Sequence, residues 1–257
     1  MSEEYNGTWP GGGAGTQTFK DGCTMLSKNL DSFKIDSRFI GHIGNDTQSL
    51  EYALKKFYYL KDKMPELFSS DTLKRFQEND KIGGAPVFEI EGIHLSTGTL
   101  TFMHHLFQIQ RFPNIKTIVE IGSGYGGQSK IIQDFMEVEY TCIDLPETLG
   151  LAEAYLTEVD NPARPTFIKS TEVPSLSPDL VISNYCLSEL DETGMDFYMD
   201  RIIKNATYFY GACGHFETRI NTKTHPHMIE RLKEFFEVTV DKEHACPSNA
   251  MVVGIKK

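Results

Sequence analysis

Apolar residues recur along this chain of 257 residues with two different periods, and the period changes near residue 112. Before that point they stand three and four residues apart, which is the spacing of helices that bury one face. The predicted helices cover residues 47–64, 67–79 and 100–111. Ser69-Ser70 predicts a break in the second helix, and Ser96 or Thr97 predicts a cap for the third. Residues 81–95 combine glycines and a proline with alternating apolar residues, which is typical of a hairpin or an extended loop.

After residue 112, short apolar runs alternate with segments of helical period, which is typical of a parallel sheet covered by helices. The predicted strands cover residues 115–121, 138–143, 166–169, 179–183 and 206–211, with helices over 128–135, 146–159, 194–203 and 225–235. The last two apolar runs, 236–241 and 251–255, are close in sequence and predict an antiparallel pair. We therefore expect a flexible tail over 1–20, a mainly helical cap over 21–112 and one α/β domain over 113–257.

The amino-acid composition indicates which kinds of molecule the protein binds and in which compartment it works. The formal net charge is −11, and proteins that follow a phosphate backbone are usually basic, so a small acceptor is favoured over nucleic acid. Met1-Ser2-Glu3-Glu4 has neither the basic nor the apolar region of a signal peptide, and no apolar run approaches the length of a membrane span. The five cysteines are scattered without a CxxC pair, which fits a reducing compartment. We expect a cytoplasmic protein that binds neither nucleic acid nor membrane.

One turn carries the strongest chemical signal. Glycines stand at 122, 124 and 126, between the apolar run 115–121 and the predicted helix 128–135. A strand, a glycine turn and a helix form a nucleotide cradle, because glycine lets a ligand approach the backbone and the helix start offers unpaired N–H groups. Asp144 ends the next strand, where a carboxylate can accept hydrogen bonds from both ribose hydroxyls.

Two kinds of cofactor fit this turn. The pattern Gly122-x-Gly124-x-x-Gly127 matches the dinucleotide fingerprint, so an NAD-dependent oxidoreductase stays open. Glu120, two residues before the first glycine, favours a different ligand. Its carboxylate would repel a pyrophosphate and would attract a cofactor that carries a sulfonium and an ammonium group.

Three segments together resemble the class I S-adenosylmethionine (SAM)-dependent methyltransferases, and most closely a group of sugar O-methyltransferases. They are residues 119–127 (VEIGSGYGG), 143–147 (IDLPE) and 180–190 (LVISNYCLSEL). The first segment is generic to the superfamily, whereas the other two are more selective for the sugar-directed group. The resemblance implies a Rossmann-like sheet, mostly parallel with an antiparallel last strand, with SAM as methyl donor and S-adenosylhomocysteine (SAH) as product.

The resemblance also implies roles at the matching positions. Glu120 would hold the methionine end of the cofactor, Asp144 the ribose and Leu145 one face of the adenine, although Leu145 is as readily a core residue. Ser170 and Thr171 would contact the adenine or would only form a turn. The whole set assigned to the cofactor is Glu120, Gly122, Ser123, Gly124, Gly126, Asp144, Leu145, Ser170, Thr171, Ser183 and Asn184.

Methyl transfer to a sugar hydroxyl needs a base near the acceptor oxygen, beyond the carboxyl ends of the fourth and fifth strands of the sheet. His215 is the first candidate, because imidazole titrates near neutral pH, and Glu189 is the second. Tyr185, His104 and Glu217 are the candidates for acceptor contact. A buried structural histidine is the simpler interpretation of His104.

Metal independence is expected. Metal-dependent O-methyltransferases usually carry aspartate after the fourth strand, where this chain has Ser183-Asn184, and Mg²⁺ prefers carboxylate oxygens. We expect a sugar or glycan acceptor, and a homodimer stays open. Two further alternatives keep the fold: an O-methyltransferase for a small phenol or natural-product alcohol, and a methyltransferase-like scaffold without activity.

Overall fold

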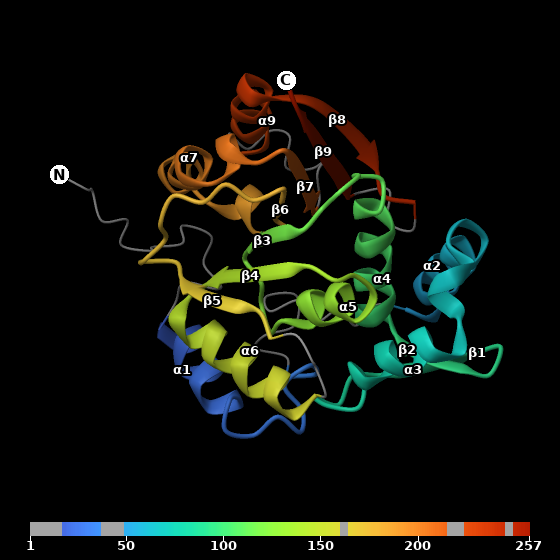
Figure 1. Cartoon of the computed structure of the whole chain (residues 1–257). Helices are drawn as coiled ribbons and strands as arrows, with labels where there is room; N and C mark the ends of the chain where they lie inside the picture. Colours follow the sequence, from blue (N-terminus) through green and yellow to red (C-terminus); the bar gives the residue numbers. More distant parts are fainter. Residues whose placement is uncertain (1–16, 37–48, 160–163, 215–223, 245–248) are drawn as a thin grey trace.

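The computed structural model describes residues 17–36, 49–159, 164–214, 224–244 and 249–257. Its centre is a sheet of seven strands in the order β5-β4-β3-β6-β7-β9-β8 (Figure 1). The strands are β3 (Thr117–Ile121), β4 (Glu139–Asp144), β5 (Thr166–Lys169), β6 (Leu180–Ile182), β7 (Tyr208–Cys213), β8 (Phe236–Lys242) and β9 (Ala250–Lys256). The inner strands are rich in β-branched and aromatic residues, which suits a sheet that is covered on both faces.

The strand order confirms the predicted sheet. β4 and β5 follow β3 outward on one side, and β6 and β7 follow on the other side, all of them parallel. β9 lies between β7 and β8 and is antiparallel to both, as the last two apolar runs predict. The direction of winding therefore reverses between β3 and β6. Open α/β sheets bind their ligands at such a switch point, outside the carboxyl ends of the strands.

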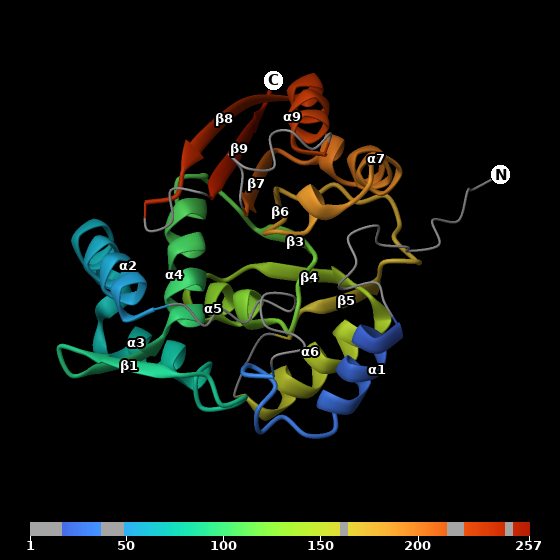
Figure 2. The same cartoon turned by 180° about the vertical axis from the view of Figure 1, so that it is seen from behind.

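Helices cover both faces of the sheet (Figures 1 and 2). One face carries α1 (Gln17–Leu26), α4 (Thr97–Ile109), α5 (Gly127–Phe135) and α6 (Pro146–Glu158). The other face carries α7 (Glu192–Arg201) and α9 (Thr224–Phe235), with the short 3-10 helices η2 (Leu187–Glu189) and η3 (Ile203–Asn205) on either side of α7 in the chain. The predicted helices of this part of the chain are confirmed.

The residues before β3 are mainly helical, as predicted. Their elements are α2 (Leu50–Lys63), η1 (Pro65–Phe68), α3 (Ser70–Glu78), the antiparallel hairpin of β1 (Val87–Ile90) and β2 (Ile93–Ser96), and α4. The predicted break lies at Ser69, whose hydroxyl accepts a hydrogen bond from Thr72 N–H at the start of α3. Ser96 caps α4 in the same way. The sequence pattern did not predict α1, which begins inside the expected tail; residues 1–16 lie outside the described residues.

The N-terminal helices and the sheet share one hydrophobic core. Tyr125, from the turn after β3, is buried against Phe33 and Tyr155, with ring centroids 5.1 and 4.9 Å away. Its hydroxyl donates to Asn79 Oδ1, which follows α3, at 3.3 Å. This packing fixes the position of the glycine turn relative to the N-terminal helices.

Candidate active site

The turn after β3 depends on glycine for its own backbone and packing. Gly122, Gly124 and Gly126 adopt φ angles of 81°, 55° and 85°, in the region that favours glycine. A Cβ atom on Gly122 would lie 2.2 Å from Cys186 Cβ, and one on Gly126 would lie 3.0 Å from Leu156 Cδ1. Turn geometry and internal contacts therefore explain these glycines, and their expected approach to a cofactor stays a prediction.

Asp144, at the end of β4, fixes the glycine turn to the strand next to β3. Its carboxylate accepts hydrogen bonds from the N–H of Gly124 at 2.8 Å and the N–H of Leu145 at 2.7 Å. Burial raises the pKa of Asp144 to about 6, against the opposite effect of these two bonds. Leu145 is buried just before α6, and its contact with the adenine stays a prediction.

Glu120, in β3, is almost fully buried in the structure. Tyr140 Oη donates to its Oε2 at 2.9 Å. Burial raises the pKa of Glu120 to about 8, although the bond from Tyr140 acts in the opposite direction. The carboxyl group is therefore largely protonated at neutral pH, and a nearby ammonium group would favour its ionisation.

Three buried polar atoms in or beside the turn have no hydrogen-bond partner among the described residues: Ser123 Oγ, Ser170 Oγ and Gln128 Nε2. The backbone N–H of Ser170 donates to Asp144 O at 2.8 Å, which places this serine next to the predicted ribose ligand. Gln128 Oε1, in the first turn of α5, accepts a hydrogen bond from Asn184 Nδ2 at 3.4 Å. Buried polar groups are rarely left unpaired, so these atoms mark places where a polar ligand would be held.

In the segment after β6, Ser183 and Asn184 bond to neighbouring elements, whereas Tyr185 has an unusual backbone conformation. Ser183 Oγ donates to Ile121 O at 3.2 Å and accepts from Leu187 N–H at 3.0 Å, so its hydroxyl connects β3 to η2. Asn184 Oδ1 accepts from Ala212 N–H at 3.1 Å. Tyr185 has a φ angle of 59°, which is rare for a residue with a bulky side chain and is typical of functional sites.

The other residues predicted for the site do not share one environment. His104 is buried on α4, and burial, with the nearby Lys56, lowers its pKa to about 3. It is therefore a neutral buried histidine. Thr171 is exposed in the turn after β5. Glu189 ends η2 and is half-buried, whereas His215 and Glu217 lie outside the described residues.

Ser123 and Gly124 form part of the glycine turn itself. Ser123 is buried in the glycine turn. Gly124 donates its N–H to Asp144, as described above. The structure thus joins Gly124 and Ser170 to Asp144 by hydrogen bonds, and it joins Asn184 to Gln128.

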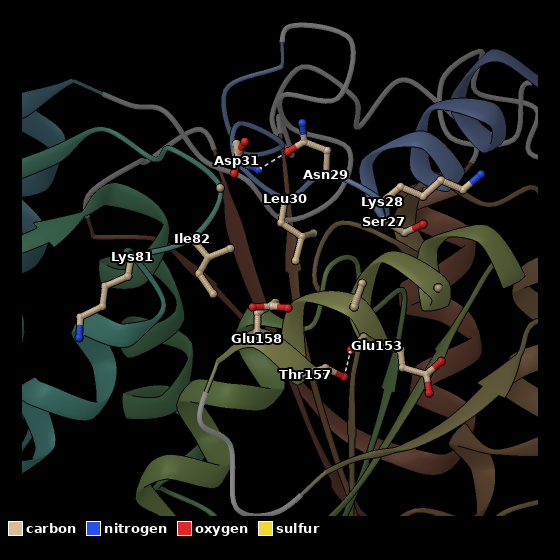
Figure 3. Close-up of a pocket in the computed structure, with 13 residues that line it drawn as sticks. Ser27, Lys28, Asn29, Leu30, Asp31, Lys81, Ile82, Glu153, Thr157 and Glu158 are labelled. Atoms are coloured by element: carbon tan, nitrogen blue, oxygen red, sulfur yellow. Dashed lines mark hydrogen bonds between the residues drawn. The ribbon is translucent and has the colours of Figure 1, made fainter.

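A hollow of about 760 Å³ lies away from this edge, between the segment after α1, the segment after α3 and the outer face of α6 (Figure 3). Leu30 and Ile82 are turned into it, while the ammonium groups of Lys28 and Lys81 point away. The part of α6 that lines the hollow begins at Gly150, beyond the first turn of the helix, whereas Asp144 precedes that helix. The hollow therefore does not belong to the edge that carries Asp144.

The described part of the chain contains neither a candidate membrane span nor a candidate metal site. None of its helices is long and apolar enough to cross a membrane. The described segments also contain no group of three or more His, Cys, Asp or Glu side chains that could hold a metal ion.

No family model matches the sequence, and no curated protein matches it. A protein assigned as an O-methyltransferase from Klebsiella pneumoniae superposes with a TM-score of 0.51 at 13% identity, over 80% of this chain and 97% of that one. An O-methyltransferase family protein from Burkholderia thailandensis gives 0.50 at 12% identity, over 83% and 74%. A protein from Pyrococcus horikoshii gives 0.52 at 11% identity, over 63% and 92%. At these identities the likeness concerns the fold, and together with the strand order it shows that this chain has the α/β Rossmann-like fold of the class I methyltransferases.

Proposed function

We propose that this protein is a SAM-dependent methyltransferase that transfers a methyl group to a hydroxyl oxygen of a small acceptor, with a sugar hydroxyl as the preferred acceptor. One observation carries the proposal. At the switch point of a methyltransferase-like sheet, the carboxyl of Asp144 lies beside the glycine turn. Ser170, which bonds to Asp144 O, and Gln128, in the helix that follows the turn, carry buried polar atoms without a partner among the described residues.

The two ends of the cofactor would be held by different groups. Asp144 would accept hydrogen bonds from the ribose hydroxyls, and Ser170 Oγ, next to it, would bond the adenosine end. Glu120 would face the methionine ammonium, whose charge would draw the proton from its buried carboxyl. The SAM sulfonium would then lie toward Asn184 and Gln128, at the end of β6.

Methyl transfer is an in-line displacement, which the protein assists mainly by alignment. The bond from the acceptor oxygen to the methyl carbon forms as the bond from that carbon to sulfur breaks, and the sulfonium becomes the neutral thioether of SAH. The hydroxyl proton passes to a general base. His215 is our first choice for this base and Glu189 the second, and no metal ion is required in this scheme.

Two acceptor classes fit the proposal. Tyr185 at the end of β6 is half-buried and could pack on one face of a sugar ring. The same ring would also pack on a phenol, and the structurally similar proteins from Klebsiella and Burkholderia are described as O-methyltransferases without a stated acceptor. The sugar preference therefore rests on the sequence segments 143–147 and 180–190.

Calorimetry followed by a transfer assay tests the proposal. The protein should bind SAM and SAH and should not bind NAD⁺ tightly. Transfer of a labelled methyl group from SAM should then be faster to methyl glycosides than to simple phenols, with or without a chelator. Tight binding of NAD⁺ would contradict the proposal, and binding of SAM without transfer to any acceptor would favour an inactive scaffold.

The choice between the two bases needs its own pair of variants. His215→Ala should lower kcat while SAH affinity stays close to that of the wild type, because the base contacts the acceptor and not the cofactor. Glu189→Ala should have a smaller effect on kcat. The reverse order of effects would assign the base to Glu189.

A further inference from the structure

A set of polar contacts at the acceptor end of the sheet has no part in the scheme above. Lys56, on the buried face of α2, pairs with Glu243 at 2.8 Å, and both side chains are almost fully buried. Lys56 Nζ also donates to Thr101 Oγ1 on α4 at 3.0 Å, and Tyr52 Oη donates to Glu243 Oε1 at 3.2 Å. This pair therefore connects two N-terminal helices to the residue that follows β8.

The contacts continue from Glu243 to the end of β6. Asn249 faces Glu243 across the β8–β9 hairpin and donates from Nδ2 to Glu243 Oε2 at 3.0 Å. The same Nδ2 atom lies 3.5 Å from Tyr185 Oη. The Tyr185 ring packs edge to face against His105 of α4, with 6.3 Å between ring centroids. Because Thr101 and His105 lie one turn apart on α4, these contacts form a closed ring of side chains.

The negative charge of Glu243 orients the side chain next to it in this ring of contacts. Burial opposes ionisation of Glu243, but Lys56 and the Asn249 amide hold its pKa at about 2. The carboxylate is therefore ionised at neutral pH and keeps the Asn249 amide nitrogen turned toward it. Stability alone does not require such a pair, because well-packed apolar side chains often replace a buried ion pair without loss of stability.

Through Tyr185, this ring of contacts extends to the switch point of the sheet. It follows β6 with a left-handed φ of 59°, and its N–H donates to Ala212 O at 2.7 Å. Such strain persists only where the surroundings hold the residue in place. The ring of contacts holds the Tyr185 side chain from two directions, through its hydroxyl and through its aromatic face.

We propose that Lys56, Glu243 and Asn249 are positioning residues for the methyl acceptor: they fix the Tyr185 side chain, which contacts the acceptor. This inference rests on the proposed methyltransferase function. It assigns the wall of the acceptor subsite to α2 and to the β8–β9 hairpin, in addition to the end of β6. The test must separate this role from a purely structural one.

The decisive variant removes both charges at once. The double substitution Lys56→Met with Glu243→Leu avoids an unpaired buried charge and keeps the volume of the pair. Its matched control is Lys130→Met with Asp134→Leu, which removes a second, equally buried ion pair within α5. For each protein we would measure the melting temperature, the Kd of SAH, and KM and kcat for the methyl glycoside that the wild type methylates fastest.

We expect the Lys56/Glu243 variant to remain folded and to bind SAH within about twofold of the wild type, with kcat/KM for the glycoside at least tenfold lower. The Lys130/Asp134 variant should keep the kinetics of the wild type. Asn249→Ala and Tyr185→Phe should each lower kcat/KM, and the combined variant should lose little more than either one, because both break the same contact.

Two outcomes would overturn the inference in distinguishable ways. If the wild type methylates glycosides and the Lys56/Glu243 variant has the same KM and kcat, the pair is only structural and the proposed function stands. If the wild type binds no SAH, or methylates none of the acceptors, the proposed function fails and the inference fails with it.

Discussion

Asp144 has two structural roles within the protein, in addition to its proposed role in binding a ligand. It accepts the N–H of Gly124 and so sets the shape of the turn, and it accepts the N–H of Leu145 just before α6. A carboxylate offers about four lone-pair positions, so these two backbone bonds do not exhaust its capacity for a ribose diol. The residue therefore links the shape of the turn to the binding of the cofactor.

The first prediction concerns Asp144. Asp144→Ala should weaken the binding of SAH at least about tenfold, because each charge-assisted hydrogen bond contributes roughly 1.5–3 kcal/mol. The control is Asp179→Ala. Asp179 also accepts two backbone N–H bonds, from Lys116 and Thr117, both at 2.9 Å. It precedes β6, however, and so lies at the amino ends of the parallel strands, whereas Asp144 lies at their carboxyl ends. The control should lower the melting temperature and leave the Kd of SAH unchanged; equal affinities of both variants would contradict the ribose assignment.

The second prediction concerns Glu120 and the pH dependence of stability. The folded protein holds the Glu120 proton up to a pKa of about 8, whereas the unfolded chain releases it near the ordinary value of 4.5. The folded state thus binds more protons between these values, and the free energy of unfolding should fall as pH rises through this range. Glu120→Gln keeps an acceptor for Tyr140 and removes the titration.

The measurement is urea unfolding of the wild type and of Glu120→Gln at several pH values between the unfolded pKa of Glu120, 4.5, and its folded pKa, about 8. The difference in stability between Glu120→Gln and the wild type should grow in favour of the variant as pH rises. Parallel curves would show that Glu120 ionises with an ordinary pKa in the folded protein.

Individual site residues differed in how far the sequence could predict them. Asp144 is predicted from its place at the end of an apolar run, and in the structure it bonds to the glycine turn, while its contact with a cofactor stays a prediction. The contacts of Glu243 with Tyr52 and Lys56 could not be predicted, because a contact between residues so far apart in the chain leaves no periodic signal. Lys56 left a weaker signal: it stands with Phe57 and Leu60 among the buried positions of α2, where a charge needs a partner.

At the scale of the elements, apolar runs predicted the strands well because a buried parallel strand is apolar on both faces. α1 escaped prediction for a local reason. Its ten residues include Gly22, which disfavours a helix, and only Phe19, Cys23 and Leu26 bury apolar side chains. Tertiary contact with α6 stabilises this helix, and such contact cannot be read from the segment itself.

The third prediction compares two glycines in two elements. Gly122→Ala should destabilise the protein by on the order of 2 kcal/mol or more, because its φ is 81° and the new Cβ would meet Cys186. Gly150→Ala should stabilise it by about 0.5–1 kcal/mol, since this glycine lies within α6 with nothing near its Cβ position. Urea unfolding measures both, and a stable Gly122→Ala protein would show that the turn is looser than described.

At the scale of the whole molecule, the N-terminal helices and the sheet are joined by more than chain connectivity. Phe33 and Tyr155 enclose Tyr125, and one core cluster includes residues of α2, α3, α4, α5 and α6. The predicted boundary near residue 112 therefore separates two patterns of sequence and does not separate two hydrophobic cores. Residues on both sides of it are needed to bury the glycine turn.

The fourth prediction follows from this shared core. Thermal or urea unfolding should show one cooperative transition, because the N-terminal helices and the sheet share one core cluster. Circular dichroism in the far and near ultraviolet should give the same midpoint. Two transitions with separate midpoints would show that the N-terminal helices unfold independently of the sheet.

The contact between α1 and α6 also has a consequence for biosynthesis. The two helices are far apart in the chain, so α1 leaves the ribosome seconds before its partner has been translated. During that interval the apolar side of α1 has no native surface to cover it. Chaperone binding to the nascent chain should therefore begin at this helix and end only when α6 has emerged.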